Sequence, residues 1–268
     1  MKLAICSLAS GSSGNCFLVK TENTAVLVDA GISGRQVEHG LADLGISLKD
    51  ISAVLITHEH SDHIKGLKVV SKASGAAVYA SRGTFRGIPF AQELLRTEVF
   101  RPGDEFSIGD LAVRSFATSH DAAEPAGFSF RAEDRQISIV TDTGTVTESC
   151  LSCVKDADIL VLESNHDESV LRMGRYPWFL KQRILSDSGH LSNDAAAGAL
   201  LRILSEEKAQ GLQKKRLVLL AHLSKENNFP EMALQTMSNI LGAGGFTAGG
   251  DLQLRVLSRT EPSPLYTL

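Results

Sequence analysis

The most informative stretch of this chain is Thr57-His58-Glu59-His60-Ser61-Asp62-His63, which directly follows an apolar run at residues 51–56. It places four side chains that can bind a metal within six residues, in the pattern H-x-H-x-D-H. Imidazole nitrogens and carboxylate oxygens are the ligands that zinc and similar divalent ions take in proteins. Histidines in a packed core do not cluster in this way, because each imidazole brings two nitrogens that need partners. A solvated polar loop rich in histidine is the alternative, and the pattern favours a metal site at the end of a strand.

Short apolar runs separated by tight turns surround this motif and predict strands joined to covering helices. Strands are expected at residues 3–8, 16–20, 25–28, 51–56, 76–80, 159–162 and 217–220, with alternating strand signals from about 106 to 141. Helices are expected at residues 33–44, 67–73 and 195–209. No proline-rich or serine-rich linker divides the chain, so we expect one layered α/β domain over residues 1–268, with 261–268 as a loosely held tail.

The composition excludes several classes of protein. Lys and Arg number 27 against 31 Asp and Glu, a net charge of −4, so an anionic substrate would need a local basic patch. The four cysteines are too few for a disulfide framework, and the pair Cys150 and Cys153 lacks the second pair of a zinc ribbon, which favours buried helix cysteines. No apolar stretch suits a secretory signal or a membrane span, so we expect a cytoplasmic protein with no membrane partner.

The H-x-H-x-D-H motif after a strand resembles the signature of the metallo-β-lactamase superfamily. Further positions match that pattern one by one, each at or just beyond the end of an apolar run: Asp29, His120, Asp142 and His222. The resemblance implies a metallo-β-lactamase fold, which is an αββα four-layer sandwich of the α/β class. It also implies a site that is assembled from both ends of the chain.

The resemblance further implies two divalent metal ions, Zn²⁺ or Mn²⁺, with Mg²⁺ also compatible. One ion would be held by His58, His60 and His120 and the other by Asp62, His63 and His222, with Asp142 between them. Asp29 would hold the histidines of the metal loop from behind. Two such ions can share a hydroxide, so no serine or cysteine nucleophile is needed.

Features between Glu163 and Ser192 bear on the substrate. Glu163 begins Glu163-Ser164-Asn165-His166-Asp167 after a buried strand, and Gly189-His190-Leu191-Ser192-Asn193 runs into a helix whose N-terminus suits a phosphate. Residues 169–185 contain basic and aromatic side chains and no acidic residue. We expect Glu163 to orient a histidine, and a phosphate to be bound by side chains from Asn15, His166, His190, Ser192, Arg172 and Arg175. The alternatives are a helix cap at Ser192, a solvated basic surface, an aromatic lid over the core, and a Glu163 that pairs with a core cation.

These motifs, with the opening Ser10-Gly11-Ser12-Ser13-Gly14-Asn15, resemble the bacterial YycJ/WalJ-like group, which is close to tRNase Z and ribonuclease J. The resemblance implies a 5′–3′ DNA exonuclease acting in DNA repair, with metal-hydroxide attack on phosphorus. Its catalytic residues would be Asp62, His190, Glu163 and Asp29. The alternatives are a thioester or lactone hydrolase of the glyoxalase II type and a non-enzymatic regulatory partner. A homo-oligomer stays open.

Overall fold

The computed structural model describes residues 2–212 and 214–268, and the expected span 1–268 includes residues 1 and 213, which lie outside them. The chain groups into two compact units. The first comprises Met1–Ala117, Ala122–Ile137 and Ser258–Leu268, and the second Thr118–Asp121 and Ser138–Leu257. The expected single domain stays a prediction.

The first unit contains a seven-stranded sheet with the strand order β14-β1-β2-β3-β4-β5-β6. Its strands are β1 (Ala4–Ala9), β2 (Cys16–Lys20), β3 (Ala25–Val28), β4 (Ala53–Leu55), β5 (Ala77–Ser81), β6 (Thr97–Phe100) and β14 (Tyr266–Thr267). β2 is antiparallel to both β1 and β3, whereas β3 and β4 are parallel. β1, β3 and β4 therefore run in the same direction, and the loops that follow them meet at one edge of the sheet.

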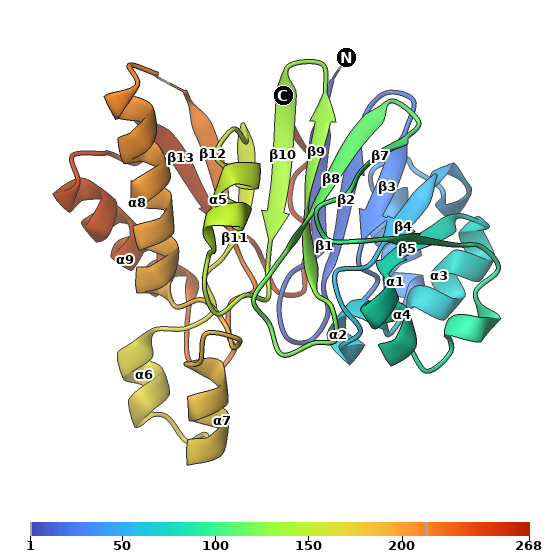
Figure 1. Cartoon of the computed structure of the whole chain (residues 1–268), viewed down its shortest axis with the longest axis horizontal. Helices are drawn as coiled ribbons and strands as arrows, with labels where there is room; N and C mark the ends of the chain where they lie inside the picture. The colour runs from blue at the N-terminus through green and yellow to red at the C-terminus, as the bar shows by residue number, and fades with distance from the viewer. Residues whose placement is uncertain (1, 213) are drawn as a thin grey trace. The chain divides into compact units, whose positions relative to one another are not determined.

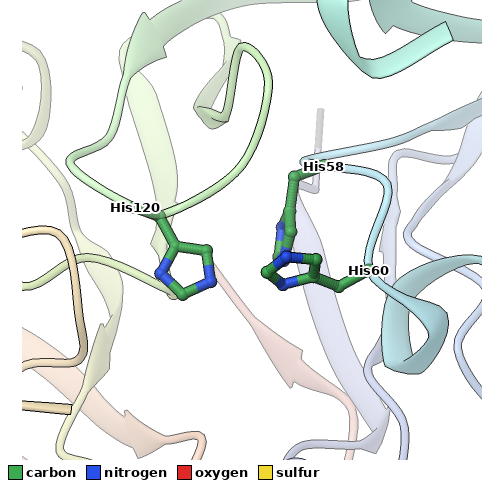
Figure 2. Close-up of side chains that lie close together, drawn as sticks. All are labelled: His58, His60 and His120. Carbon is green, nitrogen blue, oxygen red and sulfur yellow. The ribbon is translucent and has the colours of Figure 1, made fainter. Parts of the chain in front are cut away.

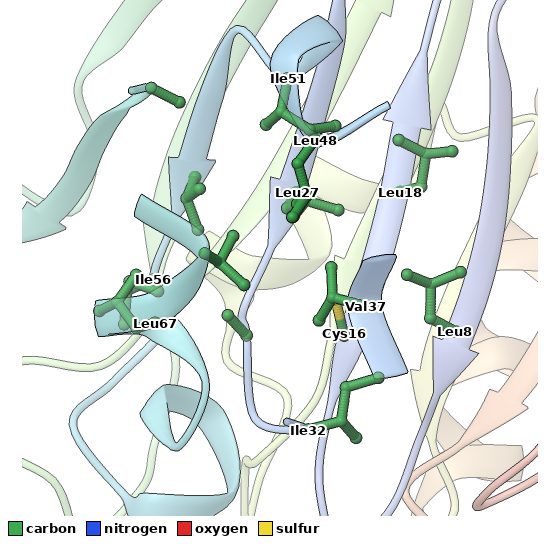
Figure 3. Packing of buried hydrophobic residues seen from close by; sticks show 14 of the residues in the cluster. Leu8, Cys16, Leu18, Leu27, Ile32, Val37, Leu48, Ile51, Ile56 and Leu67 are labelled. Atoms are coloured by element: carbon green, nitrogen blue, oxygen red, sulfur yellow. The ribbon is translucent and has the colours of Figure 1, made fainter. Parts of the chain in front are cut away.

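Helices cover this sheet where the sequence predicted them. α1 (Gly34–Ala42) begins at Ser33, whose side chain accepts from the backbone N–H of Gln36 in a capping box. α3 (Leu67–Ser74) ends at Gly75, where φ is +73°, a left-handed conformation that glycine adopts readily. Apolar side chains from the helices and strands form one buried cluster (Figure 3). Burial of this cluster is what fixes the strands that carry the loops.

The remaining elements of the first unit are short helices and a meander of strands. The helices are η1 (Leu48–Asp50), α2 (Ser61–Ile64), α4 (Arg82–Gly87) and η2 (Ala91–Glu93). The strands β7 (Glu105–Ile108), β8 (Leu111–Ala117) and β9 (Ala126–Ala132) are antiparallel neighbours, in agreement with the alternating pattern of the sequence.

The second unit has three parallel neighbours, β11 (Ile159–Glu163), β12 (Arg216–Ala221) and β13 (Leu252–Val256). The end of β10 (Arg135–Val140), from Ser138 onwards, also belongs to the second unit. The helices of this unit are α5 (Glu148–Val154), α6 (Glu168–Met173), α7 (Trp178–Ile184), α8 (Asn193–Ala209) and α9 (Pro230–Ala243). Figure 1 shows α8 beside α9. Cys150 and Cys153 are buried and form no disulfide, and α5 carries both, which confirms the prediction of buried helix cysteines.

The end of the chain differs from the expected loosely held tail at 261–268. β14 pairs antiparallel with β1, matching Ala4 with Thr267 and Ile5 with Tyr266. The N–H of Ser263 also donates to the carbonyl of Ser7 at 2.8 Å. The outer edge of β1 needs hydrogen-bond partners, and this segment supplies them. Among the described residues, no helix is both long enough and apolar enough to cross a membrane.

Candidate metal centre

His63, in the first unit, is held by a buried carboxylate. Its Nδ1 lies 2.7 Å from Oδ2 of Asp29, and Thr57 donates to the same carboxylate through its backbone N–H (2.9 Å) and its hydroxyl (2.9 Å). Burial raises the pKa of Asp29, while the charge and hydrogen bonds of His63 and Thr57 offset part of the rise. The bond from Nδ1–H to Asp29 leaves the lone pair of His63 on Nε2, the tautomer that a metal ligand needs.

The turn after β1 contacts the same histidine. Nδ2 of Asn15 lies 3.1 Å from Nε2 of His63, and the backbone N–H of Asn15 donates to the carbonyl of Asp62 at 2.8 Å. Oδ2 of Asp62 lies 3.6 Å from Nε2 of His63. Asn15, predicted to bind substrate, thus lies against two predicted ligands, as the common direction of β1, β3 and β4 requires.

The other histidines of the motif come from the loop between β4 and α2. The ring centroids of His58 and His60 are 4.5 Å apart, and those of His58 and His63 are 4.0 Å apart. Figure 2 shows His58 and His60 projecting from this loop, and His120 from the loop that follows β8. His58 and His63 are fully buried, so the first unit presents a dense group of imidazoles rather than the solvated loop of the alternative interpretation.

Backbone strain is found at three of the predicted site residues. Among the described residues, non-glycine positive φ angles occur at Asp29 (62°), Asp142 (56°) and His222 (56°), and at Glu133 (54°) in a hairpin turn. Asp29 and His222 each come directly after a strand, and Asp142 is the second residue after β10. A left-handed conformation costs such residues about 1–3 kcal/mol and is retained where function demands it.

Glu163 organises the second unit. Its Oε1 accepts from Nδ1 of His190 at 2.8 Å and lies 3.1 Å from Nδ1 of His222, while Oε2 accepts from the backbone N–H of Thr143 at 2.8 Å. Burial alone would raise the pKa of Glu163, but the charges and hydrogen bonds of His190 and His222 outweigh it, so the pKa lies below its usual range. Both rings therefore have their Nε2 atoms turned away from this carboxylate.

Those imidazoles gather around Asp142. Nε2 of His222 lies 3.6 Å from Oδ1 of Asp142, and Nδ1 of His190 lies 3.7 Å from the same oxygen. One ligand atom from each of Asp142, Glu163, His190 and His222 lies within 4.8 Å of the others. Nδ1 of His120 donates to the carbonyl of Gly189 at 2.9 Å, so the lone pair of this imidazole is on Nε2. Nε2 of His120 lies 3.9 Å from Oδ1 of Asp142. This mixed nitrogen and oxygen set fits a divalent cation.

His166 and Ser192 lie next to each other in an isolated β-bridge. His166 is 1% exposed, its ring nitrogens have no hydrogen-bond partner among the described residues, and burial lowers its pKa to about 4. The imidazole is therefore neutral at neutral pH and retains its capacity to bind a ligand. The Ser192 hydroxyl accepts from the backbone N–H of Ala195 and caps α8, as the alternative interpretation of this residue expected.

The predicted basic segment lies on α6 and α7. Arg172 is exposed and paired with Glu168 at 3.1 Å, and Arg175 is exposed in the loop that follows α6. The aromatic side chains Trp178 and Phe179 are 63% and 73% exposed. They do not form the buried aromatic lid considered from the sequence.

The chain is similar to known proteins in sequence. A family model described as a beta-lactamase superfamily domain matches residues 24–218. The chain belongs to the β-lactamase superfamily. Within it, the chain is 41% identical over 268 residues to "Exodeoxyribonuclease YycJ" of Bacillus anthracis, covering 99% of each, and 40% identical over 263 residues to "Exodeoxyribonuclease WalJ" of Streptococcus pneumoniae serotype 2 (strain D39), covering 96% of this chain and 95% of the other. Both identities confirm the resemblance to the YycJ/WalJ group.

A solved structure supports the fold of this superfamily member. The metallo-beta-lactamase fold protein YhfI of Bacillus subtilis matches with a TM-score of 0.70 at 15% identity, covering 99% of each chain. This likeness concerns the fold alone, and it confirms the predicted metallo-β-lactamase fold. Family membership and the clusters of histidine and aspartate together indicate that the superfamily member binds divalent metal.

A group of buried polar side chains, not predicted from the sequence, lies behind the second unit's histidines. Oδ1 of Asn193 accepts from the hydroxyl of Ser164 at 2.6 Å and from Nδ2 of Asn228 at 2.9 Å. Nδ2 of Asn165 donates to the carbonyl of His222 at 2.9 Å. Ser164, Asn165 and Asn193 lie in motifs quoted for the family resemblance, but no spacing rule reveals these hydrogen bonds.

Proposed function

We propose that this superfamily member is a metal-dependent phosphodiester hydrolase that acts as a 5′–3′ DNA exonuclease in DNA repair. The observation that carries the proposal is its similarity, over nearly the full length of both chains, to proteins named exodeoxyribonuclease. The partner would be nucleic acid, and DNA in particular. The cytoplasmic location and a homo-oligomer stay predictions.

The proposal includes two divalent ions, Zn²⁺ or Mn²⁺, held by the ligands that the family pattern assigns. These are His58, His60, Asp62, His63, His120, Asp142 and His222. Their assignment to a common centre rests on the sequence motifs and on family membership. Bound divalent ions provide a nucleophile at neutral pH and neutralise the charge that develops on phosphate oxygens.

The chain's own residues have two kinds of role in this proposal. Asp29 and Glu163 are positioning residues, because each accepts a hydrogen bond from Nδ1 of a histidine. The Nδ1 proton leaves the lone pair of that histidine on Nε2. His190 is the residue proposed to bind the phosphate or to give a proton to the leaving oxygen. Its side chain is 20% exposed, which gives a substrate access, and its Nδ1 is held by Glu163.

Substrate contacts are proposed for buried polar side chains and for exposed basic side chains. His166 provides unpartnered ring nitrogens, and Asn15 an amide beside His63. Arg172 and Arg175 provide exposed positive charge, next to aromatic rings that can stack on a base. Ser192 would contribute its hydroxyl proton, since only the oxygen is used in capping α8.

The test is cleavage of duplex DNA that carries a 5′-phosphate and a 3′-end label, with Mn²⁺ present and with single-stranded DNA and RNA in parallel. The wild type should shorten the duplex, and the double variant Asp62→Ala with His63→Ala should not, because it loses two predicted ligands. His39→Ala, at an exposed position on α1, is the matched control and should cleave like the wild type. Full activity of the double variant, or a wild type that hydrolyses thioesters or lactones only, would refute the proposal.

A further inference from the structure

The turn that follows β1 is fixed to the metal-ligand loop of the first unit. Besides the contacts of Asn15 with Asp62 and His63, Oδ1 of Asn15 accepts from the backbone N–H of Gly11 at 2.9 Å. The N–H of Gly14 donates to the carbonyl of Gly11, also at 2.9 Å. Hydrogen bonds thus hold both ends of the turn, and its tip has a defined position next to the predicted ligands.

Ser12 and Ser13 form the exposed tip of this turn. Among the described residues, neither their backbone N–H groups nor their hydroxyls have a hydrogen-bond partner. Successive N–H groups and serine hydroxyls in a tight turn are donors that suit phosphate oxygens. The turn itself contains no cation, unlike phosphate-binding loops that carry a lysine.

Arg259 supplies a cation from the far end of the sequence. A Cβ placed on Gly11 would lie 3.1 Å from Cγ and 3.4 Å from Nε of Arg259, so the arginine side chain lies directly over Gly11. The segment that carries Arg259 is anchored on β1, because Ser263 exchanges hydrogen bonds with Ser7. Glycine at position 11 therefore makes room for the arginine.

The guanidinium of Arg259 has no partner within the described part of the chain. Its Nε is buried and makes no hydrogen bond, and no carboxylate forms an ion pair with it. A buried donor without a partner is destabilising, and the planar guanidinium forms charge-assisted, bidentate bonds to phosphate. An anion bound beside Gly11 would satisfy it.

We infer that Ser12, Ser13 and Arg259 bind a phosphate group of the nucleic-acid strand on which the chain acts. The inference rests on the proposed function for the identity of the ligand, and on the contacts of the first unit for the site. It places a phosphate contact next to Asp62 and His63. The net charge of the whole chain is negative and does not attract a phosphate, so such a local contact is needed. The group is either the 5′-terminal phosphate or a phosphodiester within the strand.

Binding measurements on the full-length chain test the inference. The probes are inorganic phosphate and fluorescent single-stranded DNA with phosphorothioate linkages, carrying either a 5′-phosphate or a 5′-hydroxyl. We expect Arg259→Ala to weaken binding of the 5′-phosphorylated strand about tenfold or more, since bonds between charged groups are lost. Arg259→Lys should recover part of the affinity, because lysine keeps the positive charge but cannot donate two parallel hydrogen bonds as the guanidinium does. Gly11→Val, which crowds the arginine side chain, should weaken binding as well.

Arg96→Ala is the matched control. Arg96 is exposed and directly precedes β6, which is parallel to β5 and hence to β4, so it lies at the opposite edge of the sheet from the turn. Its binding should equal that of the wild type. A loss confined to the 5′-phosphorylated strand identifies the terminal phosphate, and an equal loss with the 5′-hydroxyl strand identifies an internal one.

The inference and the proposed function fail in different ways. If the wild type cleaves DNA and Arg259→Ala binds and cleaves equally well, the phosphate site is wrong and the nuclease stands. If the chain cuts no DNA but Arg259→Ala loses affinity for inorganic phosphate, the site stands and the nuclease is wrong. A wild type that binds neither probe overturns the site.

Discussion

Replacement of Glu163 by glutamine removes one acceptor from a position where three donors converge. The carboxylate accepts from His190 (2.8 Å), His222 (3.1 Å) and the N–H of Thr143 (2.8 Å). An amide offers one oxygen and one NH₂ group, so it cannot accept on both sides. If the amide oxygen faces the histidines, the NH₂ group faces the N–H of Thr143, which loses its acceptor. If the amide oxygen faces Thr143, the NH₂ group faces the imidazoles, and both imidazoles must carry their protons on Nε2.

Either orientation has a measurable cost. A buried donor left unpaired costs about 1–3 kcal/mol, and weaker bonds to the imidazoles bring the expected loss to about 2–4 kcal/mol. In a chain of this size that corresponds to a fall in Tm of about 4–7 °C. A proton on Nε2 of His222 blocks a predicted metal ligand, so metal affinity should fall about 10- to 100-fold.

The assays are thermal unfolding and metal titration of the full-length chain. Glu168→Gln is the matched control, because it makes the same chemical change at an exposed ion pair with Arg172, worth about 1 kcal/mol or less. Equal Tm and equal metal affinity for Glu163→Gln and the wild type would refute the assigned positioning role. A lower Tm with unchanged metal affinity would reduce Glu163 to a structural residue.

Three further predictions concern a buried amide, a buried thiol and a carboxylate in a turn. Asn193→Ala should lower the free energy of unfolding by about 2–4 kcal/mol in a urea titration, because Ser164 and Asn228 lose a buried acceptor. Burial raises the pKa of Cys150 to about 12, so at pH 8 roughly one thiol in ten thousand is ionised, and iodoacetamide should label it in urea but not in the folded chain. Hydrogen bonds from Thr24, Thr21 and Asn23 lower the pKa of Asp110, so its stabilising effect is present above about pH 4 and is lost as the pH falls through the lower folded value. The Tm of Asp110→Ala should accordingly approach that of the wild type in acid.

Each of these has an outcome that contradicts it. A urea midpoint unchanged in Asn193→Ala would mean that water replaces the lost acceptor. Rapid labelling of folded Cys150 would contradict its burial in α5. A Tm difference for Asp110→Ala that is constant from pH 7 to pH 2 would show that its charge is not involved.

The sequence predicted those parts of the fold in which local chemistry and pattern agree. Ser33 with Gln36 marks the start of α1, and Gly75 marks the end of α3, because capping depends on adjacent residues. The ligand motif could be found for the same reason, since its residues are neighbours in sequence. The pairing of β14 with β1 could not, because two residues such as Tyr266 and Thr267 have no period of their own. Arg259 was missed because its contact with Gly11 joins distant positions.

The pairing of β14 with β1 also bears on how the chain is made. β1 is synthesised well before β14, so its outer edge has no strand partner until residues 266–267 have emerged from the ribosome. Until then the nascent first unit exposes an unpaired strand edge, which is the kind of surface that joins other chains in aggregates. The sheet reaches its full width only after β14 has been made, and a nascent chain stalled before residue 266 would expose that edge to chaperones and proteases.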